Sequence, residues 1–192
     1  MSTRELTEIR WHGRGGQGVV TAGKLLAETA LGTGQYFQAF PDFGPERMGA
    51  PIRAYTRLSS RPITIHSQIE NPDVVLVLDP TLLGSVPVAE GLRKDGILLV
   101  NTPMSPQEVR EITGFHTGKV CTVDASHIAI DELGREITNT PMLGAFARAT
   151  GLFDMEALIQ QVRAWFGSKV TSGVVEANIR ALRRAAEEVV EG

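Results

Sequence analysis

Two stretches of this chain are apolar at every position. Residues 74–78 read Val-Val-Leu-Val-Leu, and residues 97–100 read Ile-Leu-Leu-Val. A parallel strand with helices on both faces has this composition, because neither row of its side chains meets water. Residues 52–58 instead alternate apolar and polar side chains. That alternation predicts an edge or antiparallel strand with one wet face.

Along the rest of the chain, short strand-like runs alternate with longer helix-like runs, as in α/β proteins. We predict strands over residues 8–12, 36–40, 52–58, 74–78, 96–101 and 119–124. We predict helices over residues 17–31, 106–113, 125–133, 142–150, 155–166 and 174–190, with a short piece near 87–93. Helix ends are marked by candidate N-caps at Ser105, Asp154 and Ser172 and by glycines at 114, 134, 151 and 167. The order predicts a Rossmann-like α/β fold with a mostly parallel sheet, helices on both faces and a helical C-terminal tail.

Length and charge limit the class of protein. A chain of 192 residues suits one α/β domain, so we expect a single domain over residues 1–192. The net charge of −3 argues against a nucleic-acid binder, which needs a basic face. The longest apolar runs fall far short of the ~20 residues of a membrane helix, and the polar N-terminus has no secretory core. We therefore expect a cytoplasmic protein without membrane or nucleic-acid partners.

A glycine-rich turn joins the first predicted strand to the first predicted helix. Gly13, Gly15 and Gly18 fit the spacing G-x-G-x-x-G. Gly16 adds one more position at which the backbone can adopt conformations that other residues avoid. The positive end of the helix dipole points at this turn, which suits an anion such as a phosphate. The candidate binding residues are Gly13, Arg14, Gly15, Gly16, Gln17 and Gly18. A tight turn without a ligand is the alternative.

Two nucleotide-binding motifs fit this segment poorly. A dinucleotide site places an acidic residue about 20 residues after the glycines, and Asp42 lies near that position. However, Asp42 lies in a loop rich in proline and glycine rather than at a strand end, so NAD(P) binding stays only as an alternative. Residues 18–24 have the spacing G-x-x-x-x-G-K, but Leu25 stands where the Mg²⁺-binding hydroxyl is needed. We reject that motif.

The single cysteine and the four histidines form no recognisable site. Cys121 alone cannot hold an iron–sulfur cluster or a cysteine-rich zinc ion, and its alternating surroundings predict a buried structural thiol. The histidines lie without metal-ligand spacing, and we expect surface or hydrogen-bonded side chains at His12, His66, His116 and His127. We therefore expect no metal site on this chain.

The loop over residues 40–51 is rich in proline, glycine and contact-forming side chains. Such a loop favours docking of a partner, since exposed aromatic and arginine side chains dominate many interfaces. The candidate interface residues are Phe40, Phe43, Glu46, Arg47 and Met48. The alternative is a loop that folds onto its own domain.

Three motifs together resemble one known family. They are Gly-Arg-Gly-Gly-Gln-Gly-Val-Val-Thr-Ala-Gly-Lys-Leu-Leu-Ala from residue 13, Phe-Gly-Pro-Glu-Arg-Met-Gly-Ala-Pro-Ile-Arg-Ala-Tyr-Thr-Arg from residue 43, and Asn-Thr-Pro-Met-Leu-Gly-Ala from residue 139. In order and spacing they are similar to the gamma subunit of the pyruvate/2-oxoacid:ferredoxin oxidoreductases. That family converts a 2-oxo acid and coenzyme A (CoA) to an acyl-CoA and CO₂, and passes the electrons to ferredoxin.

The resemblance implies a role without catalysis for this chain. The complex would use thiamine diphosphate, Mg²⁺ and [4Fe-4S] clusters on alpha, beta and delta-type subunits, and the chain has no thiamine motif of Gly-Asp-Gly followed by paired asparagines. The isolated chain is therefore expected to be inactive. The Gly13–Gly18 turn would help to bind CoA, and the loop over residues 40–51 would pack against the thiamine-bearing subunits.

Some points stay open at this level. Met48 stands where the family commonly has a second basic residue, which weakens any anion contact there. A stand-alone regulatory module that binds CoA or a nucleotide is the competing function. The sequence names neither the 2-oxo acid nor the final electron acceptor, which is ferredoxin or, through an added subunit, NAD⁺.

Overall fold

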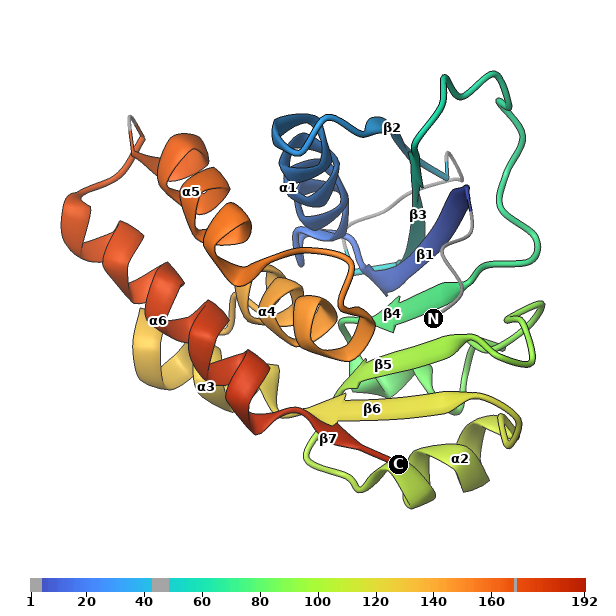
Figure 1. Ribbon diagram of the computed structural model, residues 1–192. Coiled ribbons are helices and arrows are strands. Elements are labelled where there is room, and N and C mark those ends of the chain that lie inside the picture. The colour runs from blue at the N-terminus through green and yellow to red at the C-terminus, as the bar shows by residue number, and fades with distance from the viewer. Residues whose placement is uncertain (1–4, 43–48, 168) are drawn as a thin grey trace.

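The computed structural model describes residues 5–42, 49–167 and 169–192, and its described strands form one mixed sheet (Figure 1). The strand order is β2-β3-β1-β4-β5-β6-β7. The bounds are Leu6–Arg14 (β1), Tyr36–Pro41 (β2), Pro51–Ser59 (β3), Val74–Val77 (β4), Ile97–Asn101 (β5), Lys119–Val123 (β6) and Val190–Glu191 (β7). Strands β1, β4, β5 and β6 run parallel, whereas β3 pairs antiparallel with β1 and β2, and β7 with β6. The predicted α/β fold with parallel strands in its core is confirmed.

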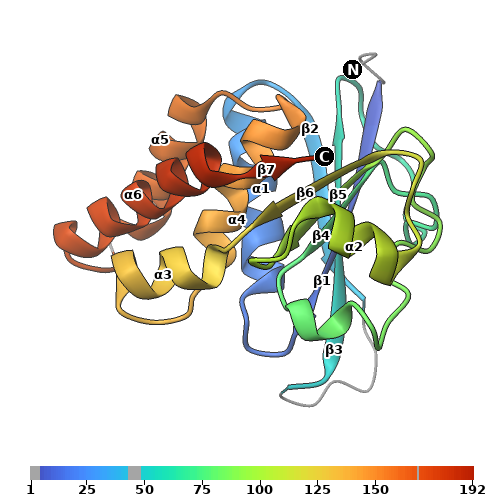
Figure 2. The ribbon, with the colours of Figure 1, turned by 90° about the horizontal axis from the view of Figure 1, so that it is seen from below.

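Helices cover the two faces of the sheet unequally (Figure 2). The bounds are Val19–Gly32 (α1), Pro106–Thr113 (α2), Ala125–Leu133 (α3), Asn139–Thr150 (α4), Met155–Phe166 (α5) and Ser172–Glu188 (α6), with a 3₁₀ turn, η1, at Pro80–Leu82. Among the described helices, α1, α3, α4, α5 and α6 bury a large apolar core against one face. On the other face, α2, η1 and the segment that follows η1 cover a smaller core.

The apolar strands divide their side chains between these two cores. Leu76 and Leu99 point to the larger core, and Val77 and Val100 point to the smaller one. All four side chains are fully buried. The uniform apolar pattern therefore has the predicted cause, which is burial of both faces of a parallel strand.

Strand β3 is antiparallel as predicted, but it lies inside the sheet between β2 and β1 rather than at an edge. The polar side chains of β3 are also not all exposed to solvent. Arg57 is 1% exposed and donates hydrogen bonds to Glu8, to Gln38 and to the backbone carbonyls of residues 65 and 67. The polar side chains of β3 are therefore partly an internal layer, because a later segment of the chain covers them.

Several predicted helix ends are confirmed. Helices α2, α3 and α5 have the predicted bounds. Ser105 forms a capping box with Glu108, and Asp154 is the N-cap residue of α5. Glycines 114, 134 and 151 adopt the left-handed conformation at helix C-termini.

Other local predictions were wrong. The piece near 87–93 forms turns, since Gly91 reverses the chain at φ +70° with its α-carbon packed against the carbonyl of Glu70. Gly167 is right-handed, and Thr171 rather than Ser172 is the N-cap of the last helix. That helix ends at Glu188, because the next residues join β6 as the short strand β7.

Helices α4 and α6 pack so closely that one glycine is required between them. A Cβ at Gly144 would lie 1.9 Å from the carbonyl oxygen of Leu182. We expect Gly144→Ala to lower the free energy of unfolding by about 1–3 kcal/mol, the usual cost of overpacking. Urea unfolding measures this loss. Gly173→Ala is the matched control in α6, where a Cβ meets no atom within 4 Å, and an equal loss there would contradict the packing argument.

Candidate functional site

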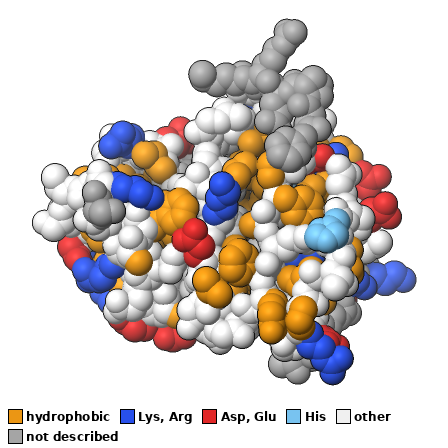
Figure 3. All heavy atoms as spheres, turned by 90° about the horizontal axis from the view of Figure 1, so that it is seen from above, with side chains coloured by type: hydrophobic (Ala, Val, Ile, Leu, Met, Phe, Trp, Pro, Cys, Tyr) orange, Lys and Arg blue, Asp and Glu red, His pale blue; other side chains and the backbone are white. Residues whose placement is uncertain are grey.

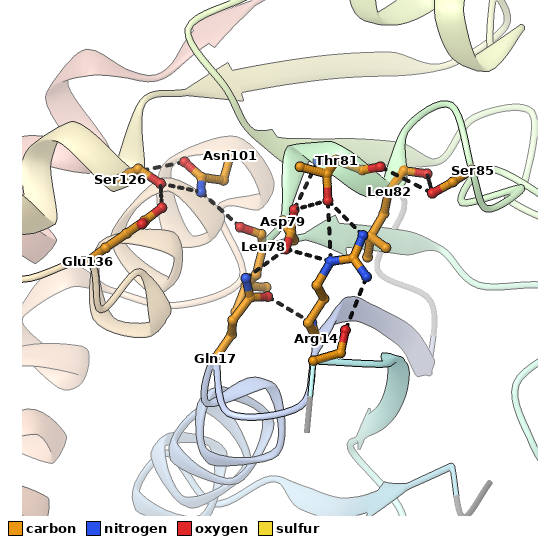
Figure 4. Close-up of polar contacts among 11 residues, drawn as sticks. Arg14, Gln17, Leu78, Asp79, Thr81, Leu82, Ser85, Asn101, Ser126 and Glu136 are labelled. Carbon is orange, nitrogen blue, oxygen red and sulfur yellow. Dashed lines mark hydrogen bonds and ion pairs between the residues drawn. The ribbon is translucent and has the colours of Figure 1, made fainter. Parts of the chain in front are cut away.

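The glycine turn lies where the connections of the sheet change face. After β1 the chain forms α1 on one face, and after the neighbouring parallel strand β4 it forms η1 on the other. In open α/β sheets, such a switch point leaves a crevice beyond the carboxyl ends of the strands, and ligands bind there. Figure 4 shows the side chains that converge at this point.

Glycine is needed at three positions of the turn. Gly16 and Gly18 have φ values of +99° and +76°, a region that other residues rarely adopt. A Cβ at Gly13 would lie 2.4 Å from a methyl carbon of Val19, so glycine there lets β1 and α1 approach. The N-cap residue Gly18 has no side-chain cap, and the first turn of α1 holds no acidic residue. The amides at the start of this helix therefore remain available to an anion.

Arg14 and Gln17 fasten the turn to the end of β4. The guanidinium of Arg14 forms an ion pair with Asp79, with 3.1 Å between Nε and Oδ2. Its Nη2 donates to Thr81 Oγ1 at 2.8 Å, and its Nη1 donates to the carbonyl of Gly49 at 3.1 Å. Gln17 donates from Nε2 to Asp79 at 2.7 Å and accepts from the backbone N–H of Arg14 at 2.7 Å. The conformation of the turn is thus set before any ligand binds.

Asp79 is the acceptor that unites this network. Its Oδ1 accepts from the N–H and the hydroxyl of Thr81, at 2.9 and 2.6 Å. Burial alone would raise the pKa of Asp79, but the hydrogen bonds from Thr81 and Gln17 and the charge of Arg14 outweigh it, so the pKa lies below its ordinary value. Asp79 is therefore an anion that holds the turn. Our sequence prediction missed it, although an aspartate between an apolar strand and a proline is a recognisable cap.

Arg14 keeps some capacity to bind a further acceptor. Each of its terminal nitrogens carries two N–H groups, and each donates one hydrogen bond within the described residues. The side chain is 32% exposed, whereas that of Asp79 is 9% exposed. The open side of the arginine therefore offers donors in the same crevice as the amides of α1.

A second polar cluster, also missed from the sequence, supports the ends of β4 and β5. Asn101 donates to the carbonyl of Leu78 at 2.8 Å and to Ser126 Oγ at 2.9 Å. Ser126 in turn donates to Glu136 at 2.7 Å (Figure 4). The start of α4 is close to the glycine turn as well. A Cβ at Gly18 would lie 3.1 Å from the side-chain nitrogen Nδ2 of Asn139.

Of the predicted interface residues, the structure describes Phe40. Its ring is half-buried, with its centroid 5.3 Å from that of Tyr55, and the guanidinium of Arg57 lies 5.5 Å from its centroid. Phe40 therefore packs on its own domain. At this position the structure agrees with the alternative interpretation, in which the loop folds onto its own domain. The other candidates, Phe43, Glu46, Arg47 and Met48, lie outside the described residues.

The NAD(P) alternative is not supported at Asp42. Its carboxylate accepts from Arg53 at 2.9 Å, from Tyr55 at 3.2 Å and from Gln68 at 2.6 Å. The carboxylate is therefore already engaged by three side chains of its own domain. Asp42 instead fixes the end of β2 to β3.

The predictions for cysteine and histidine are confirmed. Cys121 is fully buried, and burial raises the pKa of its thiol to about 12. His12 is 3% exposed and accepts a hydrogen bond from Arg10 Nε at 3.1 Å. Burial, followed by the charges of Arg10 and Arg53, lowers the pKa of His12 to about 3. His66 contacts Gln38, and the remaining two histidines are exposed.

Known proteins match this chain over nearly its whole length. The family model described as pyruvate ferredoxin/flavodoxin oxidoreductase matches residues 8–188. The pyruvate synthase subunit PorC of Thermotoga maritima is 54% identical, over 95% of this chain and 94% of its own. The common subunit gamma of the pyruvate/ketoisovalerate oxidoreductases of Pyrococcus furiosus is 49% identical, over 95% and 97%. The crystal structure of the Thermotoga subunit superposes with a TM-score of 0.88 and 49% identity, over 98% of this chain and 99% of that one.

An α/β fold with a glycine-rich turn at its switch point is typical of ligand-binding proteins. The matches make the class specific: the chain belongs to the pyruvate ferredoxin/flavodoxin oxidoreductase family and corresponds to its gamma, or PorC, subunit. In the described part of the chain, every helix is too short or too polar to cross a lipid bilayer.

The buried His12 predicts a loss of stability in acid. Its pKa is about 3 in the folded chain and near 6.5 when unfolded, so the unfolded chain binds a proton first as the pH falls. The stabilising contribution is complete above pH 6.5 and decreases between pH 6.5 and 3, by about 1.4 kcal/mol per pH unit. We expect His12→Gln to reduce this slope in urea unfolding measured from pH 7 to pH 4. The exposed His116→Gln is the control, and an equal slope in both variants would contradict the assignment.

Proposed function

We propose that this chain acts as the gamma subunit of a 2-oxoacid:ferredoxin oxidoreductase in the cytoplasm and contributes ligand contacts and assembly rather than chemistry. The complex converts a 2-oxo acid and CoA to an acyl-CoA and CO₂, and the electrons pass to ferredoxin. Thiamine diphosphate, Mg²⁺ and [4Fe-4S] clusters belong to the alpha, beta and delta-type subunits. The near full-length match to PorC and gamma subunits carries this proposal.

The choice of 2-oxo acid lies outside this chain in our proposal. The Pyrococcus relative is named as a subunit common to pyruvate and ketoisovalerate oxidoreductases. A gamma subunit shared between a small and a branched substrate supports selection by other subunits. Pyruvate is the first substrate to test, since the Thermotoga relative is named for pyruvate synthase.

The Gly13–Gly18 turn is the proposed contact for the pyrophosphate of CoA. The uncapped start of α1 supplies amide donors and a positive dipole end, and Arg14 supplies a cation with N–H groups to spare. Asp79 holds Arg14 and Gln17 in place, so the ligand does not have to order them. These contacts support a preformed anion site, which suits a pyrophosphate.

In the assembled enzyme, we expect Arg14→Ala to raise the KM for CoA by roughly tenfold to a hundredfold. A charge-assisted hydrogen bond contributes about 1.5–3 kcal/mol, and the loss of Arg14 also leaves the charge of Asp79 uncompensated beside the phosphate. Gly16→Val is expected to raise the same KM by blocking close approach of the backbone. The KM for the 2-oxo acid should change little, because that substrate binds elsewhere.

Gly34→Val is the matched control for Gly16→Val. Gly34 has a similar left-handed φ of +79°, and a Cβ there meets no atom within 4 Å. Both variants therefore carry the same backbone strain, but only one lies in the turn. Wild-type CoA dependence in both Arg14→Ala and Gly16→Val would leave the turn with a purely structural role.

The loop over residues 40–51 and the adjoining edge of the sheet are the proposed docking surface. Seen from above, hydrophobic side chains gather in several groups toward the middle of the face, and most charged side chains lie along its rim (Figure 3). Leu31 at the end of α1 is 63% exposed, and Tyr36 and Phe37 of the outer strand β2 are 49% and 38% exposed. Exposed aromatic residues next to a sheet edge support a site that a partner subunit covers.

We expect the double change Phe43→Ala with Arg47→Ala to weaken assembly of the complex at low protein concentration. It removes an apolar anchor and a multidentate donor, which are common among energetically dominant interface residues. Native mass spectrometry of the purified complex measures the fraction of bound gamma subunit. Ile112→Ala with Arg61→Ala, two exposed residues elsewhere, is the control. Equal assembly of both variants would rule out this loop as an anchor.

A further inference from the structure

A cleft of about 510 Å³ opens on the face of the sheet opposite α1, between β1, β3 and the segment after η1. Its floor comes from His12 of β1 and Arg53 of β3, which are paired across the two strands. Arg10 lies two residues before His12 on the same face of β1. The volume falls within the range of small-molecule sites. The lining includes no residue of the Gly13–Gly18 turn.

Arg10 is a buried cation that contributes to this cleft. Its side chain belongs to a residue only 5% exposed. The Nε donates to His12, and Nη2 donates to the backbone carbonyls of Val88 and Glu90. Within the described residues, Nη1 donates to no protein acceptor, although it carries two N–H groups. A buried guanidinium with donors to spare favours an anion beside it.

His12 presents a second donor. Its Nε2 accepts the hydrogen bond from Arg10, so the proton of the neutral ring lies on Nδ1. In the described part of the chain, that N–H has no protein acceptor, and the ring is 3% exposed at the cleft. This N–H is not sealed from solvent, so an acceptor on a ligand in the cleft can replace water beside it.

Arg53 completes the donor set at the mouth of the cleft. Its Nε is paired with Asp42, and its side chain is 47% exposed. Within the described residues, its terminal nitrogens donate no hydrogen bond to the protein, so they can meet a ligand. Asp42 also accepts from Tyr55 and Gln68, so its charge is largely satisfied. Glu90 is the remaining carboxylate of the lining, and it is exposed to solvent.

Part of the lining is apolar. It includes Pro51 of β3 and the pair Val86 and Pro87. Three nitrogen donors and these aliphatic side chains suit a ligand with two different ends. Such a site fixes the anionic end by hydrogen bonds and gains affinity from the apolar end.

We propose that this cleft binds a small organic anion, a carboxylate or phosphate monoester on an apolar body. Arg10 Nη1, His12 Nδ1 and Arg53 hold the anionic group, and Pro51, Val86 and Pro87 contact the body. The cleft adjoins the glycine turn, since Ala50 of its lining accepts from the N–H of Gly15, but it uses other donors and does not rest on the proposed CoA contact.

Histidine-labelled full-length chain tests the proposal by NMR. The probes are 3-methylbutanoate and isobutyl phosphate, and 3-methylbutanamide is their uncharged counterpart. We expect saturable shifts of the His12 ring resonances with at least one anion and none with the amide. A response to the carboxylate alone or to the phosphate alone identifies the anionic group.

Two variants distinguish binding in the cleft from non-specific attraction of the anion to positive charge. Arg53→Gln should weaken binding of the anion about tenfold, the loss of one charge-assisted hydrogen bond. Arg61→Gln removes an arginine whose side chain is 77% exposed outside the cleft, and should leave binding unchanged. Equal shifts with the amide, no saturable shift with either anion, or equal losses in Arg53→Gln and Arg61→Gln would overturn the proposal.

Discussion

The carboxylate of Asp79 is the contact on which the candidate site depends. It accepts from Arg14 and Gln17 of the glycine turn and from Thr81 of η1, so one side chain joins the end of β1, the start of α1 and the end of β4. Without that acceptor, Gln17 Nε2 would lose its partner at the end of β4, and Arg14 would keep only its hydrogen bonds to Thr81 and to the carbonyl of Gly49. The turn would then be held less firmly to the neighbouring strand. A preformed turn costs less conformational entropy on binding, which is the physical advantage of placing an aspartate beside an anion site.

The unequal cover of the sheet gives its two faces different functions. On the face that packs against five helices, β1 contributes Ile9 and Trp11 to a large apolar core. On the other face, the same strand presents Arg10 and His12, and β3 presents Arg53 and Arg57. Burial of this polar layer requires partners for each charge, because an unpaired buried charge is costly. Every nitrogen of the Arg57 guanidinium has a protein acceptor, whereas within the described residues Arg10 Nη1 and His12 Nδ1 have none and face the cleft.

The sequence by itself determined the type and order of most elements. Uniformly apolar runs identified β4 and β5, and helix caps such as Ser105 with Pro106 fixed the bounds of α2, because these signals depend on neighbours within a few residues. Three motifs in order were also sufficient to indicate the family, and Cys121 was recognised as a buried thiol from its strand pattern alone.

Only the tertiary structure decided what depends on distant segments. The carbonyl of Glu70 leaves no room for a side chain at Gly91, and β7 forms because the chain after α6 reaches the edge of β6. The glycine turn was visible in the sequence, but Asp79 is 65 residues from Arg14, and no local pattern pairs them. Likewise, the cleft beside His12 exists because strands distant in the chain are adjacent in the sheet. Local residue patterns specify elements, whereas a site formed by several elements is specified by the packing that brings them together.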